Sequence, residues 1–437
     1  MRFKYLVAAT LWASTQGASL AQNTVVPPAA EPAQRALTLD EAWRQAEQAN
    51  PALRRKAAEQ AAVEGAAQDA RALFFNNPQI SWEGTRRDVP LSGAPDERRK
   101  EWSAGFSQTL EIAGQRGYRV SAAEAAITAH GAELESLRRD LRVRVAQQFY
   151  RVQALQQRLG VEEAALALFE QTASAVAKRR AAGEDTKLDA NVAVVEAERA
   201  RSQLDATREQ LIEARDELAA TLQLPASSQP AVSADLADAL AQPLPALAPL
   251  LSALPMQPGQ RALAAQEEGA RAKLGLERAS RIPDVTLGLS LGREGATDAR
   301  ERLTTLSLSV PLPLFKRNAS GVGEASAALL QAQIERERGL RDGEAAVRSL
   351  HLRLQSLQRR VQRLQSVVAP TLASNAQLSE KSQRAGQIGL LEHIVVSRQV
   401  LDARRDLIDA QLDFQNTRLA LMQAASQALA SEQGAQP

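Results

Sequence analysis

The chain contains an internal repeat, and this repeat constrains its fold more than any other feature. A long helical pattern breaks at a glycine turn over residues 182–189 and then resumes, and about 200 residues later the same break recurs over residues 385–392. Upstream of each turn lies a short alternating stretch with a proline near its start, over 77–83 and 282–288. A two-fold repeat of strands and very long helices predicts an extended architecture of two similar halves, not a domain built around an active site.

The N-terminus has the pattern of a secretory signal peptide over residues 1–21. Arg2 and Lys4 precede an apolar run, and Ser19-Leu20-Ala21 provides a small-residue cleavage site. Loss of this leader removes two positive charges, which leaves 51 of the 53 basic residues to balance 51 acidic ones. The near-neutral balance argues against a nucleic-acid partner.

The composition excludes several kinds of site. The sequence has no cysteine, which rules out disulfides, cysteine-based zinc sites and a lipid-modified cysteine. No apolar run approaches about 18 residues, so no transmembrane helix is expected. We find no nucleophile with a base and an orienting residue, no metal-ligand spacing and no cofactor motif, and we predict neither an enzyme nor a cofactor. The three histidines, His130, His351 and His393, are scattered and are expected on solvated surface.

Long helices account for most of the chain. Thr38 and Glu41 form a capping-box pattern at the first helix start. From Tyr118 to Arg180 the sequence lacks proline, and its apolar residues step by threes and fours. After the first glycine turn, leucines recur seven apart at positions 204, 211 and 218, which is the spacing of a coiled-coil seam.

Four short segments alternate between apolar residues and small or polar ones. They lie at about 78–88, 100–112, 283–294 and 302–314, and the basic run 98–100 is assigned to a loop before the second of them. Strands of about ten residues with this alternation are typical of a transmembrane β-barrel, although a half-buried soluble hairpin gives the same pattern. Trp82, Trp102 and Phe106 are candidates for an aromatic girdle at a membrane interface.

The four predicted strands are too few to close a barrel. An open sheet edge in hydrocarbon would leave backbone amides unpaired, so the sheet has to be shared between subunits. Three copies give twelve strands, which suffice for a barrel with a pore. The sequence therefore predicts a homotrimer.

The predicted segments follow from these patterns. They are a signal peptide at 1–21, an N-terminal arm at 22–37, a first repeat at 38–224 with its tip near 183, a linker at 225–260, a second repeat at 261–430 with its tip near 386, and a frayed tail at 431–437.

The leader, the two repeats, the four strands and the glycine turns together resemble the TolC-type outer-membrane efflux proteins over about residues 38–430. Leu37–Ala42, Asn77–Ile80 and the compact length are most similar to the heavy-metal, CzcC-like subgroup. The resemblance implies a mainly helical fold with a small β part. In the trimer, long antiparallel coiled-coil helices form an α-helical barrel below the 12-stranded β-barrel, in the outer membrane and extending into the periplasm.

The resemblance also implies roles for individual residues. Gly183 and Gly386 match the periplasmic tip glycines where an adaptor protein docks, and Arg180 and Arg384 precede them as candidates to pair with acids or with the adaptor. Asp189 and Glu392 match acidic positions of the pore gate, although Glu392 replaces the usual aspartate. Simpler interpretations are ordinary helix caps for the glycines and helix N-terminal charges for the acids.

The function expected from the resemblance is the exit duct of a tripartite efflux system. Its partners would be a periplasmic adaptor, an inner-membrane pump and outer-membrane lipid. The expected cargo is divalent heavy-metal cations exported by an RND-type pump. Two alternatives stay open at this point: a duct for drugs or for type I protein secretion, and a periplasmic coiled-coil adaptor or scaffold without a barrel.

Overall fold

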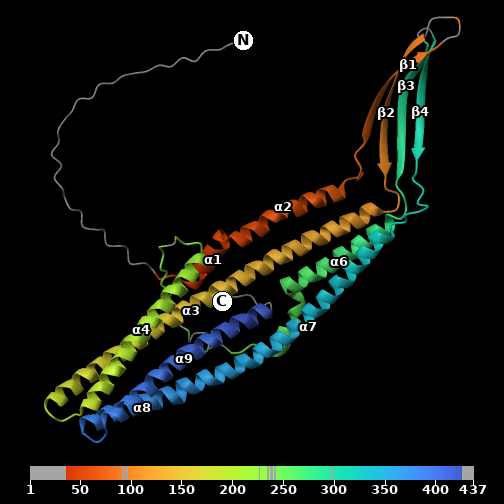
Figure 1. Ribbon diagram of the computed structural model, residues 1–437. Coiled ribbons are helices and arrows are strands. Elements are labelled where there is room, and N and C mark those ends of the chain that lie inside the picture. Colours follow the sequence, from red (N-terminus) through yellow and green to blue (C-terminus); the bar gives the residue numbers. More distant parts are fainter. Residues whose placement is uncertain are drawn as a thin grey trace, which may run out of the picture. The chain divides into compact units, whose positions relative to one another are not determined.

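The computed structural model describes residues 36–90, 93, 97–225, 227–233, 236, 240, 243–296 and 299–425. Within them the chain is mainly helical with one four-stranded sheet, which confirms the predicted fold class (Figure 1). The predicted signal peptide, the predicted arm as far as residue 35 and the predicted tail lie outside the described residues. Of the helices in the described part of the chain, none is both long and apolar enough to cross a membrane.

The elements follow one another in two similar series. The first series consists of α1 (Leu39–Ala49), α2 (Pro51–Arg71), β1 (Gln79–Val89), β2 (Glu97–Leu110), α3 (Gln115–Ala181) and α4 (Lys187–Thr221). The second consists of α5 (Leu247–Ser252), a 3-10 turn (Leu254–Met256), α6 (Pro258–Ala279), β3 (Val285–Ala296), β4 (Ala299–Ser309), α7 (Ala319–Arg363), a π-helical turn (Leu364–Val368), α8 (Ala369–Arg384) and α9 (Leu390–Ala424).

The local sequence explains where helices α1 and α2 begin. The amide of Glu41 donates to Thr38 Oγ1 at 3.4 Å, and the amide of Thr38 donates to Glu41 Oε2 at 3.0 Å, so that the predicted capping box is formed. Asn50 then caps α2 by accepting from the amide of Ala52 at 2.9 Å. Pro51 occupies the first position of α2, where a missing amide hydrogen costs nothing.

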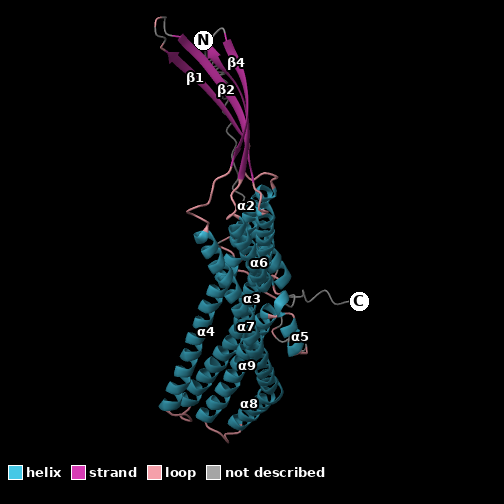
Figure 2. Cartoon of the chain, turned by 90° about the vertical axis from the view of Figure 1, so that its right-hand side faces the viewer, coloured by secondary structure: helices cyan, strands magenta, loops and turns pink. Residues whose placement is uncertain are grey.

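The sheet joins the two halves. Its strand order is β1-β2-β3-β4, and each neighbouring pair is antiparallel. The β2–β3 pair, in which Phe106 lies opposite Leu289, connects the first repeat with the second. Figure 2 shows the strands as one curved layer beyond the ends of α2 and α6. Both outer strands, β1 and β4, have a free edge in the single chain.

The helices pack through several contiguous cores. α3 contacts α1, α2, α4, α6 and α9, and Phe149 on α3 is fully buried among them. A second core lies between α5, α7 and α9 around Phe414, and a third, nearer the glycine turns, contains Phe169 and Ile394. Because α3 and α9 are covered on more than one side, the helices bury more of their surface than their charged sequences suggest.

The expectation that the histidines are solvated is wrong. His130, His351 and His393 are each less than 10% exposed. His351 Nε2 lies 3.1 Å from the carbonyl oxygen of Pro245, and His393 Nδ1 lies 3.0 Å from Ser379 Oγ. Each histidine lies in a helix that is packed against neighbouring elements, and helical periodicity alone does not show how many sides of a helix are covered.

The two long hairpins differ in one respect. α3 runs for 67 residues without a break, whereas its counterpart in the second repeat is divided into α7 and α8 by the π-helical turn Leu364–Val368. Pro370 follows within α8 and has no amide hydrogen for the carbonyl four residues earlier. A π-helical turn next to a proline is a common origin of a helix bend.

Candidate functional site

The two glycine turns have the same backbone structure. Gly183 has φ +85° and Gly386 has φ +71°, the left-handed region that favours glycine. In the first turn, the amide of Glu184 donates to the carbonyl of Arg179 at 2.9 Å and the amide of Gly183 donates to that of Arg180 at 2.9 Å. The amides of Gln387 and Gly386 make the corresponding bonds in the second turn. Both turns are Schellman motifs, so each glycine ends its helix for a local reason.

The predicted gate acids take part in the helix starts after these turns. Asp189 Oδ2 accepts from the amide of Thr186 at 3.2 Å, and the amide of Asp189 donates to Thr186 Oγ1 at 3.1 Å. Glu392 Oε2 accepts from the amide of Gly389 at 3.2 Å. Each carboxylate therefore has a capping role, in which it also benefits from the helix dipole. This role leaves oxygen atoms free for other partners, and a gating role stays a proposal.

The predicted basic residues of the turns have different surroundings. Arg384 is ion-paired with Glu380 one helical turn earlier. Arg180 is exposed, and its side chain makes no hydrogen bond or ion pair with another described residue. Its neighbour Arg179, which the sequence did not single out, pairs with Glu184 at 3.5 Å and with Asp185 at 3.0 Å. Of the two predicted arginines, Arg180 has the more accessible charge.

Sequence reasoning missed a pair of exposed leucines. Leu188 and Leu391 occupy matching positions at the starts of α4 and α9, and their side chains are 67% and 54% exposed. A large apolar side chain exposed at the same place in both repeats is a candidate contact for another protein. The internal repeat could have revealed this pair, because the two leucines align when the sequences of the two glycine turns are aligned.

Two ion pairs to buried carboxylates connect the helical hairpins. Arg405 on α9 donates two hydrogen bonds to the fully buried Glu162 on α3, one of them at 2.8 Å. Arg398, two turns earlier on α9, likewise donates two to Glu196 on α4, one at 2.8 Å. Hydrogen bonding to these carboxylates raises the pKa of both arginines. The pairs fix α9 against the first hairpin.

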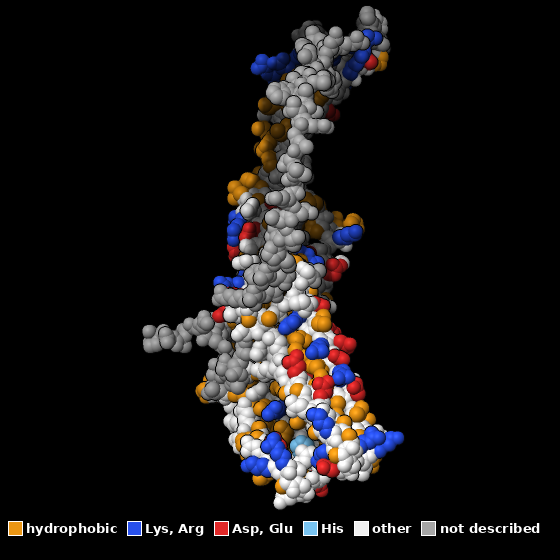
Figure 3. Space-filling model, turned by 90° about the vertical axis from the view of Figure 1, so that its left-hand side faces the viewer, with side chains coloured by type: hydrophobic (Ala, Val, Ile, Leu, Met, Phe, Trp, Pro, Cys, Tyr) orange, Lys and Arg blue, Asp and Glu red, His pale blue; other side chains and the backbone are white. Residues whose placement is uncertain are grey.

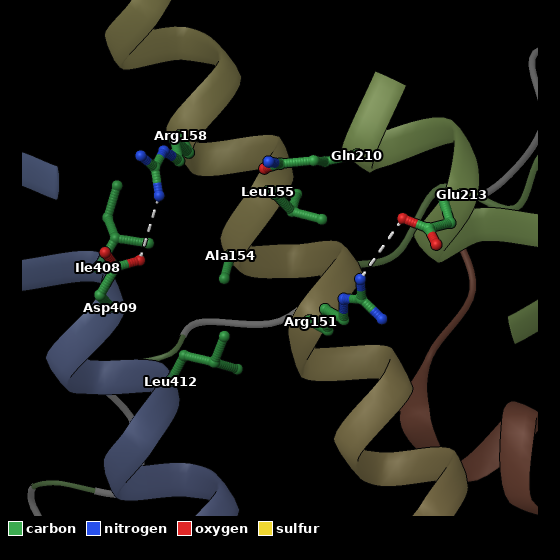
Figure 4. Close-up of a pocket in the computed structure, with 9 residues that line it drawn as sticks. All are labelled: Arg151, Ala154, Leu155, Arg158, Gln210, Glu213, Ile408, Asp409 and Leu412. Carbon is green, nitrogen blue, oxygen red and sulfur yellow. Dashed lines mark hydrogen bonds and ion pairs between the residues drawn. The ribbon is translucent and has the colours of Figure 1, made fainter. Parts of the chain in front are cut away.

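A groove of about 350 Å³ lies beside these pairs, between α4 and α9 and with α3 as its floor (Figure 4). Arg158 points to Asp409 across the groove at 3.5 Å, and Arg151 points to Glu213 at 3.7 Å. Its lining residues are Arg151, Ala154, Leu155, Arg158, Gln210, Glu213, Ile408, Asp409 and Leu412. Because the charges that line it are paired with one another, the groove offers little to a charged ligand.

One face of the sheet is apolar and exposed. Strand alternation and register place the three predicted girdle residues on it, and Trp82, Trp102 and Phe106 are 74%, 41% and 51% exposed. The same face carries Ile80, Leu287, Leu289, Leu291, Leu306 and Leu308. We call it the apolar face. A patch of this extent requires an apolar neighbour.

The opposite face carries small and polar residues that lie close together. Ser81, Gly105 and Ser290 lie side by side on it, and a Cβ at Gly105 would lie 2.6 Å from Ser81 Oγ. A Cβ at Gly292 would lie 3.0 Å from the carbonyl oxygen of Trp102. We call this face the small-residue face, and atoms of neighbouring strands come close to one another on it. Small residues are therefore needed there.

The small-residue face is acidic at the end of the sheet away from the helices. Among the described strand residues, its charged members are Glu83, Glu97, Glu101, Glu294, Glu301, Arg87 and Arg99. Arg87 pairs with Glu101 at 3.3 Å and Arg99 with Glu97 at 2.9 Å. Glu294 and Glu301 lie directly opposite each other, without an ion pair to any other described residue. The face thus keeps an excess of negative charge.

Comparison with known proteins agrees with this geometry. The outer membrane efflux protein family matches residues 42–222 and 252–427. The chain is 28% identical over 410 residues to the cobalt-zinc-cadmium resistance protein CzcC of Cupriavidus metallidurans, covering 92% of each chain. It is also 25% identical over 284 residues to the nickel-cobalt-cadmium resistance protein NccC of Alcaligenes xylosoxydans xylosoxydans, covering 64% of this chain and 62% of that one.

The fold is that of solved channels. The structure of CusC superposes with a TM-score of 0.74 at 19% identity, covering 89% of this chain and 91% of that one. Since the family matches most of the chain, the alternative of a periplasmic coiled-coil adaptor or scaffold without a barrel is wrong. The chain belongs to the outer membrane efflux protein family and is a non-enzymatic, TolC-type channel of the outer membrane that extends into the periplasm.

Proposed function

We propose that three copies of this chain form the exit duct of a tripartite efflux system whose cargo is divalent heavy-metal cations. The cargo is suggested by the 28% identity, over 92% of the chain, to a cobalt-zinc-cadmium resistance protein. The observation that carries the proposal is the acidic excess of the small-residue face, with five glutamates against two arginines among the described strand residues. In a channel, rings of carboxylates attract cations and repel anions.

The free edges of β1 and β4 support the trimer. In a lipid membrane, unpaired edge amides cost several kcal/mol each, so the four strands require partner strands. Three copies would join their edges into one closed sheet of twelve strands. The apolar face would then contact lipid, with Trp82, Trp102 and Phe106 forming the aromatic girdle, and the small-residue face would line the pore.

The glycine turns are the proposed docking sites for a periplasmic adaptor, which would connect the duct to an inner-membrane pump. Gly183 and Gly386 shape the two turns, Leu188 and Leu391 offer apolar contacts, and Arg180 offers an accessible charge. Arg384 contributes less freely because Glu380 already binds it.

The gate is proposed to lie beside the same turns. In a trimer, Asp189 and Glu392 would contribute six carboxylates around the pore entrance. A ring of such negative charges attracts cations. The ion pairs that α9 forms with α3 and α4 would keep the second hairpin in place while the entrance is closed.

A deletion strain tests the cargo. It is challenged with zinc, cobalt, cadmium and copper, and in parallel with dyes and detergents, then complemented with the wild-type gene. Sensitivity confined to divalent metals is the expected result. Sensitivity confined to organic compounds would contradict the metal cargo and favour a drug duct, and unchanged tolerance to both with loss of a secreted protein would favour protein secretion.

A pair of variants connects the cargo to the pore charge. Glu294→Gln with Glu301→Gln should complement the deletion poorly for metals, because it removes two carboxylates from the small-residue face. Glu59→Gln with Glu64→Gln, two exposed acids of α2, is the matched control for loss of two negative charges elsewhere. Equal metal tolerance with both variants would contradict a role for the pore acids.

A further inference from the structure

The apolar face carries a concentrated positive charge at the end of the sheet away from the helices. Among the described strand residues, its charged members are Arg86, Asp88, Arg98, Lys100, Arg293, Arg300 and Arg302. Six cations therefore accompany one acid on this face, the reverse of the balance on the small-residue face. This segregation corrects the assignment of 98–100 to a loop, because these residues lie in β2 and their side chains alternate between the faces.

Cations on the apolar face lie directly opposite one another. Arg86 pairs in register with Lys100, and Arg293 pairs in register with Arg302. Like charges in such positions destabilise a sheet unless another charge compensates them. Asp88, the one acid among the described residues of this face, lies 3.8 Å from Arg86 and 3.7 Å from Arg98. Lys100, Arg293, Arg300 and Arg302 have no ion pair with another described residue.

The small-residue face provides an internal comparison. It also has two arginines in register, Arg87 and Arg99. Each of them, however, has its own glutamate within the chain, Glu101 at 3.3 Å and Glu97 at 2.9 Å. The chain thus neutralises the arginine pair on one face and not the pair Arg293–Arg302 on the other. The missing anion for the apolar face has to come from outside the described chain.

The position of the cations identifies that anion. Arg293 and Arg302 lie in one row with Trp102, directly beyond three rows of apolar side chains that include Leu291, Leu289 and Leu287. At about 6.7 Å for every two residues of a strand, the apolar rows and this first basic row together span about 20 Å, close to the apolar band of an outer-membrane protein. Figure 3 shows hydrophobic side chains along the sheet and basic ones gathered at its far end. The cations are therefore placed where lipid headgroups begin.

We propose that this basic band, defined as Arg86, Arg98, Lys100, Arg293, Arg300 and Arg302, binds the phosphate groups of anionic lipid headgroups in the outer leaflet. The helices extend into the periplasm in this family, so the opposite end of the sheet faces the outer leaflet. Arginine binds phosphate in bidentate fashion, and an anion between Arg293 and Arg302 would relieve their repulsion. Trp102, in the same row, would lie at the boundary between the acyl chains and the headgroups.

The test uses the full-length protein purified as its native oligomer in detergent. The probes are a glucosamine-disaccharide lipid with two phosphates and the same lipid without phosphates, and bound lipid is counted by native mass spectrometry. The test variant is Arg293→Gln with Arg302→Gln. Its matched control is Arg87→Gln with Arg99→Gln, which also removes a cross-strand arginine pair from the same end of the sheet but from the other face.

Wild type should bind the phosphorylated lipid in preference to the phosphate-free lipid. The test variant should lose affinity by about fivefold for each cation removed, on the order of 25-fold for the pair, and the control should keep wild-type affinity. Equal losses in the two variants, or equal binding of the two lipids by wild type, would overturn the proposal. If the test variant fails to assemble, a salt titration of wild type decides: phosphate binding must weaken as salt rises, and binding that ignores salt would overturn the proposal.

Discussion

Glu162 on α3 is fully buried, yet it accepts two hydrogen bonds from Arg405 on α9, which follows it by 243 residues. The pair joins the helical hairpins of the two repeats. Arg405→Met should destabilise the protein by about 3 kcal/mol, because the buried carboxylate loses both hydrogen bonds and keeps only the longer contact with Arg158 at 3.6 Å. The free energy of unfolding, measured by denaturant titration of the purified protein, checks this value.

The double variant provides the control for this pair. Glu162→Leu combined with Arg405→Met replaces the ion pair by apolar side chains and should recover most of the lost stability. A double variant as unstable as Arg405→Met alone would show that the site does not tolerate an apolar pair.

His393 should make the second hairpin sensitive to acid. Burial lowers the pKa of His393, against an opposing effect of Glu380, so the folded state favours the neutral ring. As the pH falls through the ordinary histidine pKa of about 6.5, the unfolded state binds a proton first and the folded hairpin loses stability. Amide hydrogen exchange in α8 and α9, corrected for intrinsic rates, should be faster at pH 5.5 than at pH 7.5. His393→Gln should abolish the difference, and His351→Gln should retain it.

The glycine turns should not tolerate a side chain. Gly183→Ala and Gly386→Ala place a Cβ on a residue with positive φ, at a cost of about 1 kcal/mol each. Limited proteolysis at the turns should become faster. Gly389→Ala is the matched control, because Gly389 belongs to the second turn but has φ −79° and open space around it. Faster cleavage of the control to the same extent would mean that the effect does not arise from φ.

The stability of the sheet should depend on Gly292. A Cβ at this position meets the backbone oxygen of Trp102 at 3.0 Å, which cannot move aside, so Gly292→Ala should destabilise the protein by about 1–3 kcal/mol. At Gly288 the nearest atom is the hydroxyl of Ser307, which can rotate away, and Gly288→Ala should cost less. Thermal unfolding of the two variants in detergent compares them, and the reverse order would contradict this account of the small-residue face.

Much of this architecture is predictable from the sequence. Alternation found the strands because a half-exposed strand has a strict period of two, as in Leu287 and Leu289. The internal repeat predicted both turns, because the positive φ angle at each turn requires a glycine, Gly183 in the first and Gly386 in the second. The opposite charges of the two sheet faces also follow from that period, but only when the run Arg98–Lys100 is divided into alternate positions.

Other features depend on contacts between distant segments. Glu162 and Arg405 look like ordinary surface charges of a helix, because periodicity does not show which helix lies on the far side. The histidines were misplaced for the same reason. The π-helical turn before Pro370 is a local feature, but a proline inside a helical pattern does not specify whether the helix ends, bends or adds a residue.

The π-helical turn at Leu364–Val368 has a consequence for symmetry. The two repeats would otherwise give a trimer six nearly equivalent hairpins around its axis. Only the second repeat has the weakened helix beside Pro370 among its described residues, whereas α3 is continuous. Bending would therefore concentrate in alternate hairpins. The three hairpins of the second repeat would move while the three of the first repeat stay in place, so the entrance of the duct would open with three-fold and not six-fold symmetry.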